Sequence, residues 1–335
     1  MFPTRREILF GAAATVTGGL IWSDGPRFVH AQEAPPETTR IRLAKPPTLC
    51  DAPEFALDEL LAADGITEVE YIVTDVGPIL NEAIASGRID FAQHFSGPMI
   101  VEIDRGKRIT MLAGVHVGCF ELFAKDGINS VGDLKGRWVG IPGMGSSAHV
   151  FLSAMATLIG LDPTRDINWV TSAEAKPVEM FLDGKVDAFL GFPPDPQRLR
   201  AQGVSHVIVN SAQDRPWSQY FCCMLAGNPD FVRTKPIATK CMVRAMLRAS
   251  DLCLSAPSRV ARRNVDRGFT PNYEYALQTL SDVPYGRWRE YDPEDTIRFY
   301  ALRLREAGMI KSSPDQIIAD GTDWRFLREV RRELG

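Results

Sequence analysis

One stretch of this 335-residue chain occurs twice, 97 residues apart, and this duplication limits the folds open to it. Six aligned positions define the repeat: Glu82, Ile84, Gly87, Arg88, Ile89 and Asp90 correspond to Glu179, Phe181, Gly184, Lys185, Val186 and Asp187. In each copy, helix-spaced apolar residues lead to a glycine suited to ending a helix and then to a short strand-like run. Each copy predicts a helix, a turn and a strand, although two ordinary βα units could agree by coincidence.

The agreement continues upstream. Strand-like runs at 68–73 and 167–170 are each followed by a threonine, and the earlier runs at 40–45 and 138–141 each lead through proline into an amphipathic helix. Alternating strands and helices of this length predict parallel sheets with right-handed crossovers. We therefore expect an α/β fold with one sheet in each of two lobes.

The rest of the chain is expected to complete these lobes. Runs at 109–115, 119–124 and 220–226 are typical of strands that could carry the chain between lobes. Helical patterns at 237–254, 293–307 and 324–334 are expected to return to the first lobe. The predicted division is residues 40–117 and 222–335 for lobe 1, with residues 118–221 for lobe 2.

The N-terminus is typical of an export signal. Arg5 and Arg6 precede an apolar run that ends at Trp22, and Ala31 offers a small side chain before a cut. The arginine pair favours twin-arginine export. A retained membrane anchor is the alternative, but the run 8–22 is shorter than the ~20 residues that cross a bilayer. We expect a cleaved signal peptide at 1–31, a flexible lead-in at 32–39 and a periplasmic mature chain.

Composition and motifs exclude several kinds of chemistry. A formal net charge of -4 gives no general attraction to nucleic acid. Walker and Gly-x-Ser-x-Gly motifs are missing, and the histidines, cysteines and glutamates form no compact metal-ligand set along the sequence. We therefore expect no catalytic residue, no metal and no cofactor. The six cysteines permit disulfides whose pairing the sequence leaves open.

Ligands of open parallel sheets bind beyond the carboxyl ends of the strands, so the loops after the repeated strands are the candidate site. The candidate ligand-binding residues are Pro47, Thr48, Gly77, Phe95, Ser96, Gly97, Gly145, Ser146, Ser147, Lys176, Phe192 and Pro193. Ser146 or Ser147 can cap a helix whose positive end attracts an anion. Phe95 and Phe192 either enclose a planar ligand or belong to the core, and His94 and His116 either border the cleft or are structural. Few charged residues lie in these loops, which argues against a highly charged ligand.

Residues 143–148 also satisfy the Gly-x-Gly-x-x-Ala pattern of dinucleotide-binding loops. That pattern should be followed, ~20 residues later, by an acidic residue at the end of the next strand. Glu174 comes too late for this role. A helix start that binds a simple anion, or an ordinary capped helix, is therefore preferred to a nucleotide site.

Over residues 40–255 the chain resembles the periplasmic substrate-binding proteins of the nitrate, sulfonate and taurine transport class, which includes binders of thiamine-pyrimidine precursors. The resemblance rests on the runs 90–92, 130–136, 139–141, 145–147 and 184–188. It implies a type II periplasmic-binding-protein fold with two hinge strands, and ligand held at Gly145, Ser146 and Ser147. It extends to Ser96 and Gly97, although the preceding run Gln93-His94-Phe95 departs from the short turn of sulfonate binders and leaves the ligand class open.

The resemblance implies a solute-binding component of an ABC importer, without enzymatic activity. Its partners would be a small organic anion or heteroaromatic ligand and a permease in the inner membrane, and we expect a monomer. Two alternatives stay open at this point. One is an enzyme of the thiamine-pyrimidine-synthase type, for which the pair Cys222-Cys223 is too little of the cysteine-rich motif. The other is a periplasmic sensor that binds a ligand and docks to a receptor.

Overall fold

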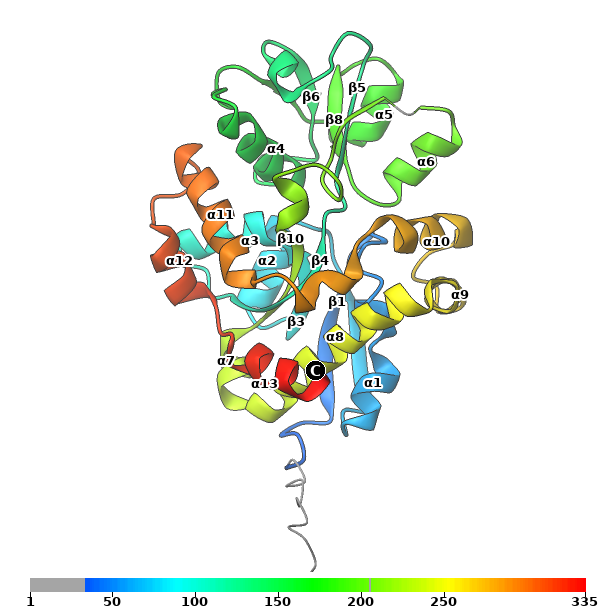
Figure 1. Ribbon diagram of the computed structural model, residues 1–335, viewed down its shortest axis with the longest axis vertical. Helices are drawn as coiled ribbons and strands as arrows, with labels where there is room; N and C mark the ends of the chain where they lie inside the picture. The colour runs from blue at the N-terminus through cyan, green and yellow to red at the C-terminus, as the bar shows by residue number, and fades with distance from the viewer. Residues whose placement is uncertain (1–33, 205) are drawn as a thin grey trace, which may run out of the picture. The chain divides into compact units, whose positions relative to one another are not determined.

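The computed structural model describes residues 34–204 and 206–335, and these carry two separate five-stranded sheets (Figure 1). The predicted signal peptide, with its arginine pair and cut site, lies outside the described residues. The first sheet has the order β2 (Glu68–Val73), β1 (Arg40–Lys45), β3 (Phe91–Phe95), β10 (Phe221–Gly227) and β4 (Thr110–Val117). The second has the order β7 (Asn168–Val170), β6 (Trp138–Gly140), β8 (Ala188–Gly191), β5 (Glu121–Ala124) and β9 (Val207–Asn210). We call the parts built on them lobe 1 and lobe 2.

Corresponding strands take corresponding places in the two sheets, as the repeat predicts. The strands β1, β2 and β3 are parallel, and so are their counterparts β6, β7 and β8. The prediction of wholly parallel sheets is wrong, because β10 pairs antiparallel with β3 and β4, and β5 pairs antiparallel with β8 and β9. These two strands run the other way because each enters its sheet from the opposite lobe.

The aspartate that closes each copy of the repeat makes the same contacts in both lobes. The Asp90 carboxylate accepts the backbone N–H of Arg42 at 2.8 Å, and the Asp187 carboxylate accepts that of Trp138 at 3.0 Å. The backbone N–H groups of both aspartates donate to the carbonyl groups of the same partners. The repeated aspartate therefore joins β3 to β1 in one lobe and β8 to β6 in the other.

Thirteen α-helices in the described residues cover the sheets. Lobe 1 begins with α1 (Asp58–Ala63), α2 (Pro78–Ala85) and α3 (Ser96–Asp104), and lobe 2 carries α4 (Ser147–Leu158), α5 (Pro177–Leu182) and α6 (Asp195–Ala201). The C-terminal series is α7 (Pro229–Thr234), α8 (Pro236–Ser255), α9 (Pro257–Asp266), α10 (Tyr273–Asp282), α11 (Pro293–Glu306), α12 (Pro314–Gly321) and α13 (Arg325–Leu334). Short 3-10 turns are η1 (Glu54–Ala56), η2 (Val131–Leu134), η3 (Trp217–Gln219) and η4 (Tyr285–Arg289). In this part of the chain no helix is both long and apolar enough to span a bilayer.

The last C-terminal helix lies against the first sheet, and α10 and α11 also contact lobe 2. Met111 of β4 accepts the backbone N–H of Asp323, just before α13, at 3.0 Å. On the other side, the Tyr300 ring of α11 lies 5.8 Å from that of Phe151 in α4, and Asp282 of α10 pairs with Arg200 of α6. Sheet membership changes between β4 and β5 and again between β9 and β10. The predicted lobe boundaries at 117/118 and 221/222 stay a prediction.

Candidate functional site

A small buried pocket lies where the strand ends of the two lobes meet. Its lining comes from the loops after β1 and β2, the end of β3, the loops after β6 and β8, and both segments that cross between the lobes: Thr48, Cys50, Asp51, Val76, His94, Phe95, Cys119, Phe120, Ser147, Phe192 and Cys223. The cavity volume is about 20 Å³, room for one or two water molecules. The structure is therefore a closed form, in which an organic ligand has no space.

Four of the twelve sequence-predicted residues line this pocket: Thr48, Phe95, Ser147 and Phe192. Gly77, Gly145, Ser146 and Pro193 lie close to the pocket and form contacts between the lobes. A Cβ placed on Gly77 would be 3.6 Å from the Cα of Ser146, and one placed on Gly145 would be 3.7 Å from Pro78. The Pro193 carbonyl accepts the backbone N–H of Leu49 across the lobes at 3.2 Å.

The remaining predicted residues are not brought to the pocket. Pro47 and Lys176 are exposed and lie outside its lining. Ser96 begins α3 directly after β3, and its buried hydroxyl has no hydrogen-bond partner. Gly97 belongs to the contact between α3 and α4, because a Cβ there would lie 2.9 Å from Val150. A role for these four in ligand binding stays a prediction.

The start of α4 offers two backbone donors. The Ser146 hydroxyl caps the helix by accepting the backbone N–H of His149 at 3.3 Å. Among the described residues, no protein acceptor meets the N–H groups of Ser147 and Ala148. Ser147 lines the pocket, and the N-terminus of a 12-residue helix attracts negative charge. This end of the pocket is thus suited to an anionic group.

His149 holds the loop before this helix in place. Its Nδ1 accepts the backbone N–H of Gly145 at 3.0 Å, and its ring packs edge-on against Trp169. Burial lowers the pKa of His149 from 6.5 to about 4. The imidazole is therefore neutral near pH 7, and its unprotonated Nδ1 is what keeps Gly145 in place.

Acid should destabilise the protein partly through His149. The unfolded state binds a proton near pH 6.5 and the folded state only near pH 4, so folding stability is complete above pH 6.5 and falls as the pH drops towards 4. The full loss is about 3 kcal/mol for this one group, since each pKa unit corresponds to ~1.4 kcal/mol. We expect His149→Asn, whose side chain can still accept from Gly145, to lose less free energy of unfolding between pH 7 and pH 4.5 in urea titrations. Equal losses in both proteins would contradict this. His94 is also held neutral by burial, but it is present in both proteins and so contributes equally to both losses.

Aromatic rings form the apolar side of the pocket and continue into the core between the lobes. The Phe95 ring lies 5.3 Å from that of Phe120 and 5.1 Å from that of Phe151, and Phe192 lies 5.8 Å from Phe120. Phe95 is 2% exposed. This position is compatible with both roles considered for Phe95 and Phe192, enclosing a ligand and packing in the core, since their rings belong to the core and face the pocket.

Two carboxyl groups are buried beside the pocket. Asp51 accepts the side-chain amide of Gln93 at 2.9 Å, and Glu54 accepts the Gln93 backbone N–H at 3.2 Å. Burial raises the pKa of Glu54 to about 8 and raises that of Asp51 well above its usual range. Glu54 is therefore largely protonated near neutral pH, and burial disfavours the charged form of Asp51 as well.

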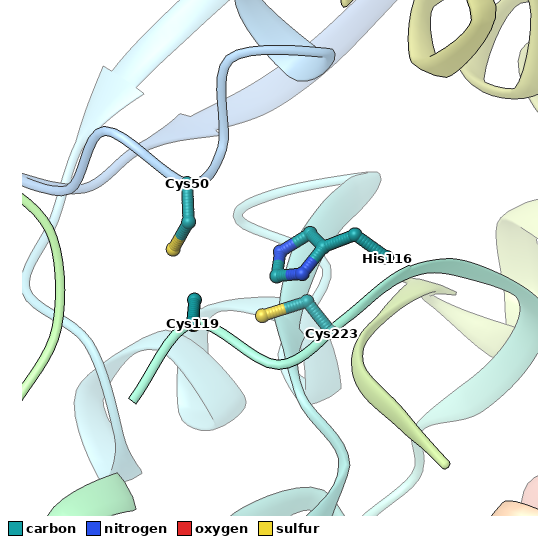
Figure 2. Close-up of side chains that lie close together, drawn as sticks. All are labelled: Cys50, His116, Cys119 and Cys223. Atoms are coloured by element: carbon teal, nitrogen blue, oxygen red, sulfur yellow. The ribbon is translucent and has the colours of Figure 1, made fainter. Parts of the chain in front are cut away.

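The structure also gathers a set of residues that the sequence did not assign: Cys50, His116, Cys119 and Cys223, here called the Cys–His cluster (Figure 2). Their donor atoms all lie within 4.8 Å of one another, and all four residues are buried. The expectation of no compact set of cysteine and histidine is wrong, because it considered spacing along the chain. These residues come from the loop after β1, from β4 and the crossover that follows it, and from β10, and they meet only when the lobes form.

Two lobes with equivalent sheets, two crossing segments and a pocket between the strand ends make up the type II periplasmic-binding-protein fold. Residues 34–265 match the NMT1-like family, and the chain belongs to that family.

Solved structures with the same fold include three ligand-binding proteins. The nitrate-binding protein NrtA from Synechocystis PCC 6803 has a TM-score of 0.74 and 16% identity, covering 90% of each chain. A zinc-bound ligand-binding component of an ABC-type import system from Staphylococcus aureus has a TM-score of 0.71 and 13% identity, covering 88% of this chain and 99% of that one. The MOPS-bound alkanesulfonate-binding protein SsuA from Xanthomonas axonopodis pv. citri has a TM-score of 0.70 and 17% identity, covering 87% and 100%. A search of curated proteins gives no match.

Proposed function

We propose that this chain is the solute-binding component of an ABC importer and captures a small organic anion or heteroaromatic compound between its lobes. One observation carries the proposal: the loops after equivalent strands of both lobes meet at one buried pocket. The two segments that cross between the lobes also contribute to its lining. A site of this kind binds by enclosure and needs no bond to be made or broken. We therefore propose binding, not catalysis.

The pocket suggests how a solute would be held. An anionic group would accept the N–H of Ser147 at the start of α4, and the apolar body would lie against Phe95 and Phe192. With the lobes closed there is room only for water, so the lobes must separate to admit a solute and stay further apart while it is bound. Contacts that the solute makes with both lobes then favour this partly closed, solute-bound arrangement over the fully open one.

The solved structures with this fold support an anionic solute and a location in the periplasm. Proteins of the same fold bind nitrate and alkanesulfonate, and their names place one of them in the periplasm. Together with the predicted signal peptide and its arginine pair, this supports a periplasmic protein that delivers its solute to an inner-membrane permease; we propose that it acts as a monomer. Genes for a permease and an ATPase beside this one would distinguish an importer from a sensor.

A thermal-shift screen tests the binding proposal. The compounds are organic acids, sulfonates, aromatic carboxylates and pyrimidines, each added to the purified mature chain. We expect at least one to raise the melting temperature in a concentration-dependent way, because a ligand that binds only the folded state stabilises it by mass action. A screen in which no compound of these classes stabilises the protein would contradict the proposed solute class.

An ion pair between the lobes, outside the pocket, stabilises their closed arrangement and can be removed by substitution. Arg200 of α6 pairs with Glu121 within lobe 2 at 2.7 Å and with Asp282 of lobe 1 at 2.6 Å. We expect Asp282→Asn to weaken binding of the stabilising compound by about 2- to 5-fold in calorimetry, since a half-buried ion pair contributes ~0.5–1 kcal/mol. The control Glu290→Gln removes a carboxylate that pairs with Arg287 in the same turn, and should leave the affinity unchanged. Equal effects of the two substitutions would contradict a role for this contact in closure.

A further inference from the structure

The Cys–His cluster has the composition and spacing of a metal site. Its donor atoms, three sulfurs and one ring nitrogen, lie within 4.8 Å of one another, and each residue is at most 6% exposed. Figure 2 shows the side chains of Cys50, His116 and Cys223 directed towards a common centre from different segments of the chain. The neighbouring cavity of about 20 Å³ touches three of the four residues and is large enough for an ion.

The histidine is held in the form that binds metals. Its Nδ1 lies 3.2 Å from the carbonyl oxygen of Val117, which can only accept, so Nδ1 carries the proton. Its Nε2 is then the atom with the lone pair, and it is buried without any hydrogen-bond partner. Metal-binding histidines are typically oriented in this way, by donating the other ring N–H to a carbonyl or carboxylate. A buried acceptor left unpaired costs ~1–3 kcal/mol, which a metal bond would offset.

Contacts around Cys50 fix the loop that carries it. The Thr48 hydroxyl lies 2.9 Å from the Cys50 sulfur, and the Tyr285 hydroxyl donates to the Cys50 backbone carbonyl at 3.1 Å. The Tyr285 ring also packs edge-on against the ring of His116. One tyrosine therefore positions residues from two of the segments that meet at the cluster.

We infer that the Cys–His cluster binds one Zn²⁺ ion that joins the loop after β1 to both segments crossing between the lobes. Three cysteines and one histidine are an established set for structural zinc. A tetrahedral ion with Zn–S of ~2.3 Å and Zn–N of ~2.0–2.1 Å places its ligand atoms ~3.5–3.8 Å apart. The cluster has to contract by about 1 Å to reach that geometry.

Binding releases protons and fills every coordination position. The three cysteines give up one proton each, so three thiolates, one neutral imidazole and Zn²⁺ form a centre with a net charge of -1. With four protein ligands no position is open to substrate, which assigns the ion a structural role. It would hold both crossing segments and the β1 loop together at the bottom of the cleft, whatever solute the cleft accepts.

A disulfide is the competing use of these sulfurs. The Cys119 sulfur is 3.4 Å from that of Cys222, although the two are not joined in a disulfide in the structure. A bond between them would remove Cys119 from the cluster and leave two sulfurs and one nitrogen. Peptide mapping of the full mature chain without reduction therefore belongs to the test.

The experiment measures metal content and then replaces the metal by Co²⁺, which absorbs strongly when thiolates bind it. The full mature chain, purified without chelators, should contain about one zinc per molecule. After zinc removal, titrated Co²⁺ should produce thiolate charge-transfer bands that saturate at one equivalent. Cys223→Ser should weaken Zn²⁺ binding by about 100-fold or more and lower the intensity of these bands, because one of three thiolates is lost, whereas Cys253→Ser, at an equally buried cysteine of α8, should bind as the parent does.

The parent protein alone can overturn the inference, so an unfolded variant does not leave it undecided. A parent chain that holds no zinc and gives no charge-transfer bands with Co²⁺ would contradict it, as would an intact Cys119–Cys222 disulfide in the mapped protein. Equal loss of the bands in the Cys223→Ser and Cys253→Ser variants would also contradict it. The result is separate from the solute proposal, because zinc content and the thermal-shift screen succeed or fail independently.

Discussion

Ser147→Phe should abolish solute binding, with an affinity at least about 100-fold below that of the parent. Ser147 is buried, lines the pocket and stands at the first position of α4. A phenyl ring there would fill the cavity, which has room for only one or two waters, and would hold the lobes apart. Calorimetry with the compound found by thermal shift measures the loss, and Ser255→Phe, at an exposed serine that ends α8, should bind normally.

A second substitution at the same position separates bulk from hydrogen bonding. Ser147→Pro removes the backbone N–H without filling the pocket, and proline is favoured at the first position of a helix. The preceding residue, Ser146, already has the extended backbone that proline requires, with ψ of 162°. We expect about 10-fold weaker binding of an anionic solute, the equivalent of one charge-assisted hydrogen bond. If both variants bound as tightly as the parent, the assignment of this helix start to the ligand would be wrong.

Gly118→Ala should be the most damaging single methyl addition at the crossover between the lobes. Gly118 has φ of +36°, and a Cβ there would lie 2.3 Å from the Cα of Ala212, so the backbone itself would have to move. We expect a loss of about 3 kcal/mol in the free energy of unfolding, measured in urea. The neighbouring Cys119 would be displaced with it, which should also lower the zinc content.

Gly127→Ala is the matched control for this effect. Gly127 also has a positive φ, +86°, but a Cβ there would meet nothing within 4 Å. It should therefore cost only the ~1 kcal/mol of backbone strain expected when alanine adopts a left-handed conformation. Similar losses for the two alanine variants would show that the contact with Ala212 does not limit this crossover.

The order of strands and helices along each lobe could be predicted because the repeat consists of local sequence patterns. The run from Glu82 to Asp90 and its copy from Glu179 to Asp187 contain the helix end, the turn and the aspartate that binds the neighbouring strand. Helices α8 and α11 likewise follow the predicted spans within two residues, since their apolar spacing is continuous. The direction of β5 and β10 was missed because direction depends on which lobe a strand comes from, and no local pattern records this.

The site was predicted in part, for a related physical reason. Topology identifies the loops that meet, which is why Thr48 and Ser147 were found, but it does not fix how each side chain in a loop is oriented. Pro47 and Lys176 face solvent, and Gly97 is needed for the close approach of α3 and α4. The Cys–His cluster was missed because Cys50, the pair His116 and Cys119, and Cys223 are separated from one another by long stretches of chain. The only available signal was that Cys119 and Cys223 fall on the two segments expected to cross between lobes.

The most direct test of the account is a crystal structure of the mature chain grown with the compound that stabilises it most. We expect density for that compound between the lobes, in contact with Ser147 on one side and with Thr48 or Phe95 on the other, and lobes further apart than in the closed form. Density for the compound on the outer surface of either lobe, with the cavity between Ser147 and Thr48 still closed, would contradict it.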